Sequence, residues 1–469
     1  MATTSDISNG ARPGPLGDPL TDNPRPGSAP GGFFGHPRGL STLFFTEMWE
    51  RFSYYGMRAF LILYMVHALG FDDKHAGSVY GTYTASVWAA AIIGGIIADR
   101  WLGQYKSVLI GGIIIAIGHF TLAFHPLPFF YAGLACIVVG TGLLKPNVSG
   151  IVGSLYDTND TRRDAGFSIF YMGINLGAAI GPFVAGGFAQ KVDWHIGFAC
   201  AGVGMLLGLI QYVRGRKHLQ PAIDRLEAQR RAAREQSRTN VAASMSEGRT
   251  VGGFTAVEWK RLAAMAVFFV FAAVFWGAYE QAGSTLNLFG DRYTRTSILG
   301  VSFPSSWFAS VQAIFVIVLA PGFAWLWVRL GRREPSTPTK FAIGLLFIGL
   351  SFVLLLVPAT HLHDSPGVRV SPFWLIGCYF IQELGELALS PVGLSVFTKL
   401  SPVKIVGFML GVWFLADSVG SKVAGLAAGF ISTAPLTELF GVVAAVCLGA
   451  SLVAFAMIIP VKRLMGGVR

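Results

Sequence analysis

Residues 47–60, EMWERFSYYGMRAF, carry glutamates and arginines inside a run of otherwise apolar residues. On a helix with 3.6 residues per turn, one face of this segment is polar over about 60 degrees. That face consists of Glu47, Arg51, Tyr54 and Arg58, with Glu50 and Tyr55 at its flanks. Ionisable groups at membrane depth usually face a protein interior or a wet cavity, where they move ions or bind substrate. The segment therefore predicts a proton or substrate pathway, and a salt bridge that only fixes packing is the alternative.

The rest of the chain has the composition of a membrane protein. Of its 469 residues, 53% are hydrophobic and 13% are charged, whereas soluble domains carry about 25% charged residues. A bilayer crossing needs about 20 apolar residues, and about twelve such stretches are present. They lie near residues 40–68, 78–98, 106–125, 128–153, 165–189, 194–214, 258–289, 305–330, 340–359, 371–398, 403–431 and 435–460. Lipid offers no hydrogen-bond partners to an open backbone, so we predict an all-α integral membrane protein with twelve transmembrane helices.

The net charge of +11 is concentrated in alternate loops. The basic residues are Arg100 and Lys106, Arg162 and Arg163, those of 214–261, Arg329 with Arg332 and Arg333, Lys399 with Lys404, and Lys462 with Arg463. The positive-inside rule then places both termini in the cytoplasm. Because topology explains the charge, no nucleic-acid partner is expected. The four cysteines lie in apolar runs without metal-ligand spacing, so we interpret them as small packing residues and expect no metal there.

Residues 214–250 form a long polar insert that divides the spans six and six. The predicted organisation is a disordered tail at 1–39, a six-helix bundle at 40–214, a cytoplasmic linker at 215–257 and a second bundle at 258–469. Within the linker, LEAQRRAARE has the composition of a basic helix that lies on the membrane face and attracts anionic lipid. A solvated tether is the open alternative.

The segment GGIIADRWLGQYK, residues 94–106, closes the second span and turns into the third. Its glycines let helices approach closely, and Asp99 and Arg100 can pair with charged partners or a helix end. This segment resembles the loop signature of the major facilitator superfamily, and GFAWLWVRLGRR, residues 322–333, resembles a degraded copy. The resemblance implies two pseudo-symmetric six-helix bundles around a midplane site, with Asp99 and Arg100 as residues of conformational gating. A tight charged turn is the plainer alternative.

A more specific resemblance covers both halves of the chain. Residues 47–58, EMWERFSYYGMR, resemble the ExxER signature of the proton-dependent oligopeptide transporter (POT) family. Further segments similar to this family are GLLKPNVSG (142–150), FSIFYMGINLGAAIGP (167–182), FWGAYEQAGSTLNLF (275–289), LGELALSPVGLS (384–395) and GVWFLADS (411–418). The resemblance implies a bacterial proton-coupled symporter of the inner (plasma) membrane that imports di- and tripeptides by alternating access. It implies a functional monomer, no enzymatic activity and no cofactor.

The resemblance also implies roles for individual residues. The proton-coupling residues are expected to be Glu47, Glu50, Arg51, Lys145 and Glu280. The substrate-binding residues are expected to be Arg51, Tyr54, Tyr55, Arg58, Trp88, Lys145, Asn175, Trp276, Glu280, Gln312, Glu386, Trp413 and Ser418. Lys145 would hold the peptide carboxylate or a coupling carboxylate, Asn175 the peptide backbone, and Glu386 the peptide amino terminus. Trp276 and Trp413 would shape the side-chain pockets.

The chemistry of a zwitterionic peptide favours the same function. Such a ligand needs a cationic and an anionic end of its cavity, and the two halves supply them separately. Arg51, Arg58 and Lys145 come from the first half, and Glu280 and Glu386 from the second. Making and breaking a contact with a cation changes the proton affinity of a carboxylate. We therefore predict that Glu280 exchanges partners with Arg51 or Lys145.

Some positions depart from the family pattern. Trp88 stands where a binding tyrosine is expected, and Gln312 and Ala313 stand where an Asn-Pro pair is common. Both departures put ligand contacts in question. Asp417 and Lys422 are additional charges in the eleventh span. We interpret them as a local electrostatic feature and not as part of the proton path.

Other functions compete with peptide transport. Residues 175–187, NLGAAIGPFVAGG, also resemble a motif of drug/proton antiporters, and a nitrate-like anion transporter would use the basic first half. The arginine-rich first span disfavours lipophilic cations, and the ExxER set with Glu386 favours peptides over nitrate. A membrane enzyme would need a nucleophile with its base, or a metal. His361, His363 and Asp364 have conceivable ligand spacing, but they lie in a short external loop.

Overall fold

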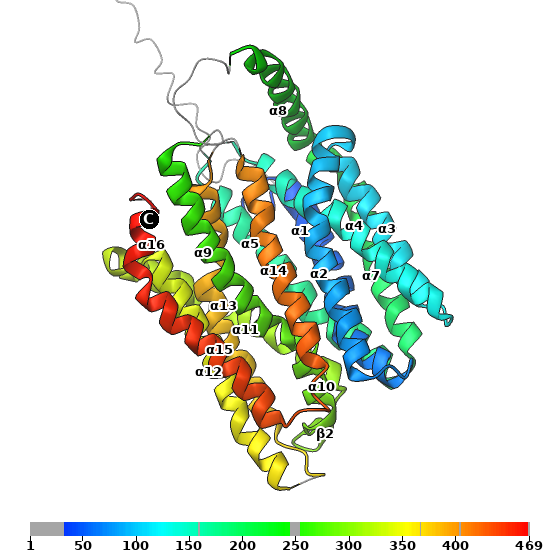
Figure 1. Cartoon of the computed structure of the whole chain (residues 1–469). Helices are drawn as coiled ribbons and strands as arrows, with labels where there is room; N and C mark the ends of the chain where they lie inside the picture. The colour runs from blue at the N-terminus through cyan, green and yellow to red at the C-terminus, as the bar shows by residue number, and fades with distance from the viewer. Residues whose placement is uncertain (1–31, 158–159, 244–253, 366, 403–404, 468–469) are drawn as a thin grey trace, which may run out of the picture.

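The computed structural model describes residues 32–157, 160–243, 254–365, 367–402 and 405–467. Over these residues the chain is almost entirely helical, apart from loops and a short hairpin of β1 (Ser297–Ile298) and β2 (Val301–Ser302). The helices stand side by side in two groups, with α8 (Arg216–Ala243) between them in the sequence (Figure 1). Residues 1–31 of the predicted tail, 244–253 of the predicted linker, and Lys404 lie outside the described residues.

The N-terminal group contains six membrane-crossing segments. They are α1 (Arg38–His67), α2 (Asp73–Ile97) with the π-helical turn Ala98–Leu102, α3 (Gln104–Leu122), α4 (Leu127–Ser154), α5 (Arg163–Gly181) continued through the π-helical turn Pro182–Gly186 into α6 (Gly187–Lys191), and α7 (Trp194–Arg214). The turn after α5 begins at Pro182, because proline lacks the N–H that an α-helix needs and its ring clashes with the preceding turn. Asp72 and Asp193 cap α2 and α7 by accepting backbone N–H groups.

The C-terminal group contains the other six segments. They are α9 (Ala256–Tyr279) with the 3₁₀ turn Glu280–Gly283 and α10 (Thr285–Arg292), α11 (Phe308–Leu330) preceded by the 3₁₀ turn Ser305–Trp307 and followed by another at Gly331–Arg333, α12 (Thr337–Asp364), α13 (Pro372–Leu400), α14 (Val406–Ala428), and α15 (Leu436–Ala456) with α16 (Ile458–Leu464). A capping box of Thr255 and Glu258 starts α9. The 3₁₀ turn that interrupts this span carries Glu280 at its first position.

Nine helices within the described ranges are long and apolar enough to cross a membrane. Three further long helices of the two bundles, α1, α13 and α14, carry charged side chains within otherwise apolar sequence. Together they account for the twelve predicted spans. We call the end of the molecule with β1 and β2 the hairpin end and the opposite end, which carries α8, the linker end (Figure 1).

The predicted linker contains a helix in place of the solvated tether. α8 follows α7 directly and contacts α1, α3, α4 and α7 of the N-terminal group. Leu219 and Ala222 are its buried anchors, at 0% and 1% exposure. Arg225 donates to the carbonyl oxygen of Ser154 at 3.3 Å and pairs with Asp157 at 3.1 Å. α8 is therefore attached to one bundle.

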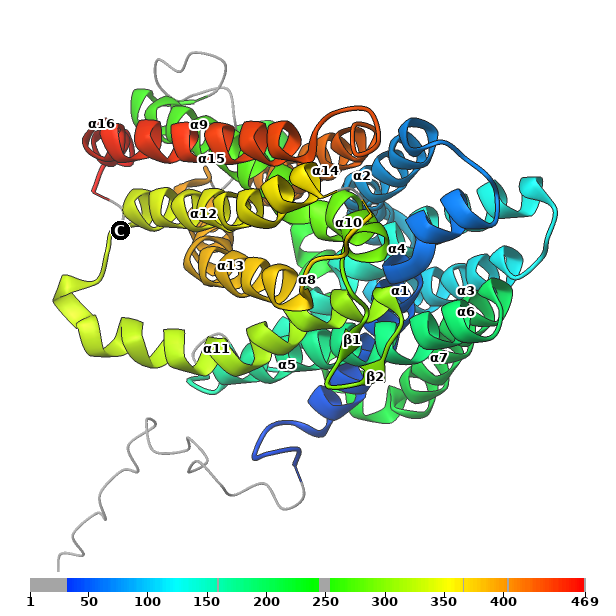
Figure 2. The same ribbon diagram turned by 90° about the horizontal axis from the view of Figure 1, so that it is seen from below.

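The two bundles meet along α2 with α14 and along α5 with α11 (Figure 2). Glycine makes the first of these contacts close, since a Cβ atom on Gly425 would lie 2.4 Å from the Cα of Gly81. Small residues permit such approach in lipid, where van der Waals packing takes over from the hydrophobic effect. A bulkier residue at either position would separate the bundles.

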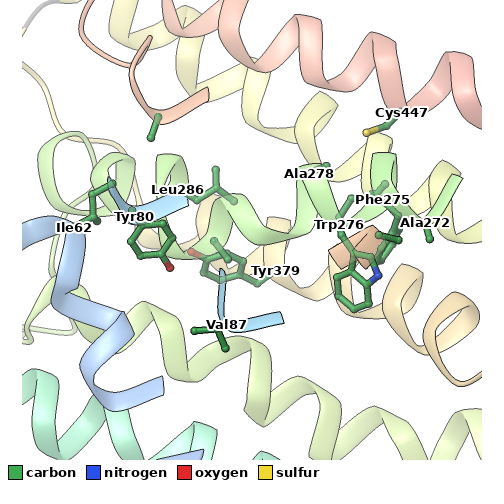
Figure 3. Close-up of a cluster of buried hydrophobic side chains, with 14 of the residues drawn as sticks. Ile62, Tyr80, Val87, Ala272, Phe275, Trp276, Ala278, Leu286, Tyr379 and Cys447 are labelled. Carbon is green, nitrogen blue, oxygen red and sulfur yellow. The ribbon is translucent and has the colours of Figure 1, made fainter. Parts of the chain in front are cut away.

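The largest buried apolar cluster also crosses between the bundles. Figure 3 shows part of it: Ile62, Tyr80 and Val87 from the N-terminal bundle together with Ala272, Phe275, Trp276, Ala278, Leu286, Tyr379 and Cys447 from the C-terminal bundle. The two bundles therefore pack against each other through buried apolar side chains over part of their length.

A contact outside the membrane-spanning segments fixes the start of α1. Nδ1 of His36 lies 2.9 Å from the hydroxyl of Tyr156, and both residues are buried. Burial and the nearby Arg162 lower the pKa of His36, so the folded state favours the neutral ring. A lowered folded pKa makes protonation destabilising, and stability is therefore lost as the pH falls below the unfolded value of about 6.5.

This linkage predicts an acid-sensitive stability that depends on His36. Between about pH 7.5 and 5.5, the melting temperature of the wild-type chain in detergent should fall more than that of His36→Gln, which cannot take up the proton. Differential scanning fluorimetry of both proteins at the two pH values measures this difference. Equal decreases would remove His36 as a source of the acid sensitivity.

Candidate functional site

A cavity of about 80 Å³ lies between the two bundles, and we call it the central chamber. Its polar lining is Tyr55 and Arg58 of α1, Asn175 of α5, Tyr279 and Glu280 at the end of α9, and Gln312 of α11. Alanines, a glycine and a valine from the same elements complete the lining. The structure therefore brings five of the predicted site residues to one space: Tyr55, Arg58, Asn175, Glu280 and Gln312.

A buried ion pair joins the two bundles across this chamber. Nη2 of Arg58 donates to Oε2 of Glu280, and the two residues are 7% and 6% exposed. Nε of Arg58 also donates to the hydroxyl of Tyr80 on α2 at 2.5 Å. Asp417 of α14 is near enough to interact electrostatically with both members of the pair. A cation of the first half and a carboxylate of the second thus neutralise each other where the bundles meet.

The remaining charges of α1 form a second cluster with α4. Lys145 donates to Oε1 of Glu47 at 2.6 Å, and Nε of Arg51 lies 3.6 Å from the same oxygen. Arg51 also makes a two-pronged contact with Glu50, with Nη2 to Oε1 at 2.5 Å. The cluster therefore pairs two carboxylates with two cations, and Glu47 and Arg51 lie one helical turn apart, in the i,i+4 order that favours such a pair. We call these four residues the ExxER cluster.

The ExxER cluster lies beside the chamber and is not part of its lining. The guanidinium carbon of Arg51 is 5.0 Å from the ring centre of Tyr54, and that of Arg58 is 5.9 Å from the same ring. Tyr54 therefore stands between the two ion-pair groups. Glu280 pairs with Arg58 and with neither Arg51 nor Lys145, so the predicted partners are engaged with Glu47 and Glu50 in this conformation.

Five other predicted binding residues lie outside the chamber lining. They are Trp88, Trp276, Trp413, Ser418 and Glu386. The ring of Trp88 stacks on Phe414 at 5.8 Å, Trp276 packs on Gly420, and Trp413 packs on Gly393 and Phe397. The hydroxyl of Ser418 donates to the carbonyl oxygen of Ala85 at 2.8 Å. Trp413 and Ser418 are thus engaged in helix packing, and no ligand role is needed to explain their burial. Glu386 differs because its Oε2 is buried without a hydrogen-bond partner among the described residues.

Sequence reasoning missed three polar groups next to the chamber. Tyr279 lines it and donates to Glu383 at 2.9 Å, and Gln382 accepts from the side chain of Gln312 at 3.0 Å. Glu383 is fully buried. One signal was available, since Gln382, Glu383 and Glu386 follow each other within two turns of one apolar span.

Polar contacts between loops and helix ends close the hairpin end. Arg292 donates two hydrogen bonds to Asp73, at 2.8 and 2.6 Å, and Nε2 of His67 lies 2.8 Å from Asp291. Asp291 also accepts from Ser305 at 2.7 Å. Each of the first two pairs joins one bundle to the other. We call His67, Asp73, Asp291 and Arg292 the hairpin-end clamp, which the sequence did not reveal.

Loss of one clamp pair should open this end. Asp73→Asn leaves Arg292 without its bidentate carboxylate, and a hydrogen bond to a charged group is worth about 1.5 to 3 kcal/mol. Ala178 of α5 lines the central chamber. In a cysteine-free chain with a cysteine at this position, labelling by a membrane-impermeant maleimide from the hairpin side should become about tenfold faster. Exchange of the two charges, Asp73→Arg with Arg292→Asp, should restore slow labelling. Unchanged labelling in Asp73→Asn would mean that the clamp does not control access.

The predicted gating residues lie at the linker end. The carboxylate of Asp99 accepts from Gln104 at 3.2 Å, and its carbonyl oxygen accepts from Nε of Arg230 on α8 at 2.6 Å. Arg100 follows it in the same exposed π-helical turn. The structure thus brings the signature turn into contact with the linker helix, and the gating role remains a prediction.

Comparison with known proteins identifies the family. The profile of the POT family matches residues 105–235 and 254–446, which is most of the chain. The chain belongs to the POT family. This confirms the family that the sequence motifs indicated, and with it the fold of two six-helix bundles.

Relatives of this POT-family protein cover nearly its whole length. An uncharacterized transporter YclF of Bacillus subtilis is 41% identical over 93% of this chain and 96% of its own. The peptide transporter YePEPT of Yersinia enterocolitica is 36% identical over 93% and 97%, and a di-/tripeptide transporter of Lactococcus lactis is 34% identical over 93% and 98%. These relatives are transporters.

Solved structures of POT transporters have the same architecture. A variant of a POT peptide transporter in complex with alafosfalin matches with a TM-score of 0.82 at 40% identity, over 93% of this chain and 97% of the other. A POT family transporter in complex with 5-aminolevulinic acid matches with a TM-score of 0.81 at 32% identity, over 92% and 98%. The two-bundle arrangement is therefore that of the POT family.

Proposed function

We propose that this POT-family protein imports di- and tripeptides together with protons by alternating access. The observation that carries the proposal is the buried pair of Arg58 and Glu280, which joins the two bundles at the central chamber. Relatives named as peptide transporters support the substrate class. The ionisable groups of the chamber support the expected coupling of transport to protons.

The chamber has the electrical polarity that a peptide requires. The N-terminal bundle contributes Arg58 to the lining, with Arg51 and Lys145 beside it. The C-terminal bundle contributes Glu280 to the lining, with Glu386 outside it. A peptide bound with its carboxylate toward the first group and its amine toward the second would draw the bundles together. A ligand shifts a conformational equilibrium only if it binds one conformation more tightly than the other, here the closed one.

Proton coupling follows from the same ion pair. When Glu280 takes up a proton, its charge disappears and its attraction for Arg58 weakens, which frees the guanidinium to bind the peptide carboxylate. Release of that proton restores the negative charge of Glu280, which pairs with Arg58 again and displaces the ligand. One proton that crosses about 100 mV and about one pH unit supplies roughly 3.7 kcal/mol. At about 1.4 kcal/mol per decade this sustains several-hundredfold accumulation of peptide.

We assign the hairpin end to the outside of the cell and the linker end to the cytoplasm, with both termini inside an inner-membrane protein that works as a monomer. The exposed positive charges of α8 fit this orientation. With this orientation, the hairpin-end clamp closes the structure on its extracellular side. The proposed bundles are residues 40–214 and 258–469, with the linker at 215–257.

Uptake into liposomes tests the proposed function. Purified full-length protein should accumulate labelled dialanine when an inward proton gradient and a negative interior potential are imposed, and recovered dialanine should be chemically intact. Unlabelled tripeptide should compete, whereas nitrate and free alanine should not. Competition by nitrate would favour an anion transporter, and chemical conversion of the dialanine would favour an enzyme.

A further inference from the structure

A second cavity lies at the linker end, apart from the central chamber. It has a volume of about 340 Å³ and is lined by the π-helical turn after α2, the start of α3 and one side of α8. Four basic side chains line it against a single acidic one: Lys106, Arg216, Arg230 and Arg231 against Glu227. We call it the linker cavity. Its excess of positive charge calls for an anionic ligand.

Two of the four basic side chains, Arg216 and Arg230, are held by contacts that leave N–H donors available for a ligand, while Arg231 pairs with Glu227 at 3.9 Å. The guanidinium of Arg216 lies 5.2 Å from the ring centre of Tyr105, which itself stacks on Tyr212 at 4.8 Å. Arg230 uses Nε to bond the carbonyl oxygen of Asp99. An arginine carries five N–H donors, so these contacts orient the guanidinium groups without exhausting them. A phosphate ester, with several acceptor oxygens, matches such a set.

The surroundings of the cavity point to an amphiphilic ligand. Trp101 lines it, is 68% exposed, and stands at the end of the second membrane span. Tryptophan at such a position favours the boundary between lipid and water. Leu102, Ile223 and Leu226 add apolar lining next to the basic groups. A ligand at this position therefore meets both charge and the bilayer edge.

We propose that the linker cavity binds the phosphate headgroup of an anionic phospholipid. The phosphate lies against Arg216 and Lys106, and the glycerol and first acyl carbons run past Trp101 into the bilayer. Basic cavities on the cytoplasmic side of membrane proteins are suited to such headgroups. This site is separate from peptide binding, and the proposal rests on the membrane orientation assigned above but not on the transported substrate.

The bound headgroup would also have a mechanical effect. It would join α8 to the start of α3, which directly follows the turn that carries Asp99 and Arg100. The contact between Arg230 and Asp99 already links α8 to that turn. The lipid therefore stabilises the arrangement of α2, α3 and α8 seen in the structure. In membranes that contain the anionic lipid, unfolding by heat or denaturant must also break the contact between protein and headgroup.

Binding of a fluorescent phosphatidylglycerol to the full-length protein in detergent tests the proposal, with fluorescent phosphatidylcholine as the neutral probe. The wild type should prefer phosphatidylglycerol. At about 1 kcal/mol for each basic residue near the lipid, affinity should fall about fivefold in Lys106→Gln and in Arg216→Gln, and about twenty-five-fold in the double variant. Lys217→Gln is the matched control, because Lys217 is exposed on α8 and does not line the cavity.

Each outcome decides for or against the site. Equal binding of the two lipids, or an equal loss in Lys217→Gln and Arg216→Gln, would mean general charge attraction and would overturn the proposal. Displacement of the lipid by millimolar inorganic phosphate or glycerol phosphate as effectively as by unlabelled phosphatidylglycerol would assign the cavity to a soluble phosphate ester. Thermal unfolding of each variant checks that a lost affinity does not reflect a lost fold.

Discussion

Replacing Glu280 with Gln is expected to abolish proton-driven accumulation of dialanine while counterflow exchange continues. Glutamine keeps the size of the side chain and its capacity to hydrogen-bond, but it cannot gain or lose a proton. The proposed exchange with Arg58, which would couple proton movement to ligand binding, is therefore lost. Accumulation in liposomes should fall from several-hundredfold to about one, because the proton gradient of roughly 3.7 kcal/mol no longer acts on the peptide.

Two further variants make this result specific. Glu438→Gln, at an exposed carboxylate in the first turn of α15, should accumulate dialanine as the wild type does. Counterflow in Glu280→Gln shows that the protein remains folded, which matters because removal of one member of a buried ion pair costs about 3 to 5 kcal/mol. Asp417→Asn is the decisive comparison, since Asp417 interacts with both Glu280 and Arg58. Persistent accumulation in Glu280→Gln, with loss in Asp417→Asn, would transfer the coupling role to Asp417.

The twelve spans were predictable because lipid imposes a simple rule on sequence. Each crossing needs a continuous apolar run, and the bounds of the runs fall within a few residues of the helices. The second span shows how far a predicted helix start can differ from the observed one. Its apolar run begins near residue 78, but α2 begins at Asp73 because Asp72 caps it.

The partners within the site were harder to predict, because they depend on how helices rotate and pack. The pair of Glu47 and Arg51 follows from one helical turn, and the structure contains it. The pair of Arg58 and Glu280 joins residues 222 positions apart, so no local pattern encodes it. Trp413 was predicted to shape a ligand pocket, yet α14 turns it onto Gly393 of α13. The motifs indicated which residues belong to the candidate site, but helix packing determines which of those residues line the same chamber.

Glu386 presents the strongest remaining case for a direct ligand contact. It is 6% exposed on α13, and its Oε2 has no hydrogen-bond partner within the described parts of the chain. It lies one turn after Gln382, which contacts the chamber residue Gln312. Because residues four apart share a helix face, the carboxylate is directed to the same side as the chamber. A buried carboxylate oxygen without a donor is costly, and the ammonium group of a peptide would supply three.

Glu386→Ala should therefore weaken binding of peptides that have a free amino terminus. A hydrogen bond to a charged group is worth about 1.5 to 3 kcal/mol, so the inhibition constant of dialanine should rise roughly ten- to hundredfold. N-acetyl-dialanine, which lacks the ammonium group, should bind wild type and variant alike. Glu383→Gln should leave the ratio of the two inhibition constants unchanged, because Glu383 is bonded to Tyr279. An equal loss for both peptides in Glu386→Ala would show that this carboxylate supports the fold of the chamber and does not recognise the amino terminus.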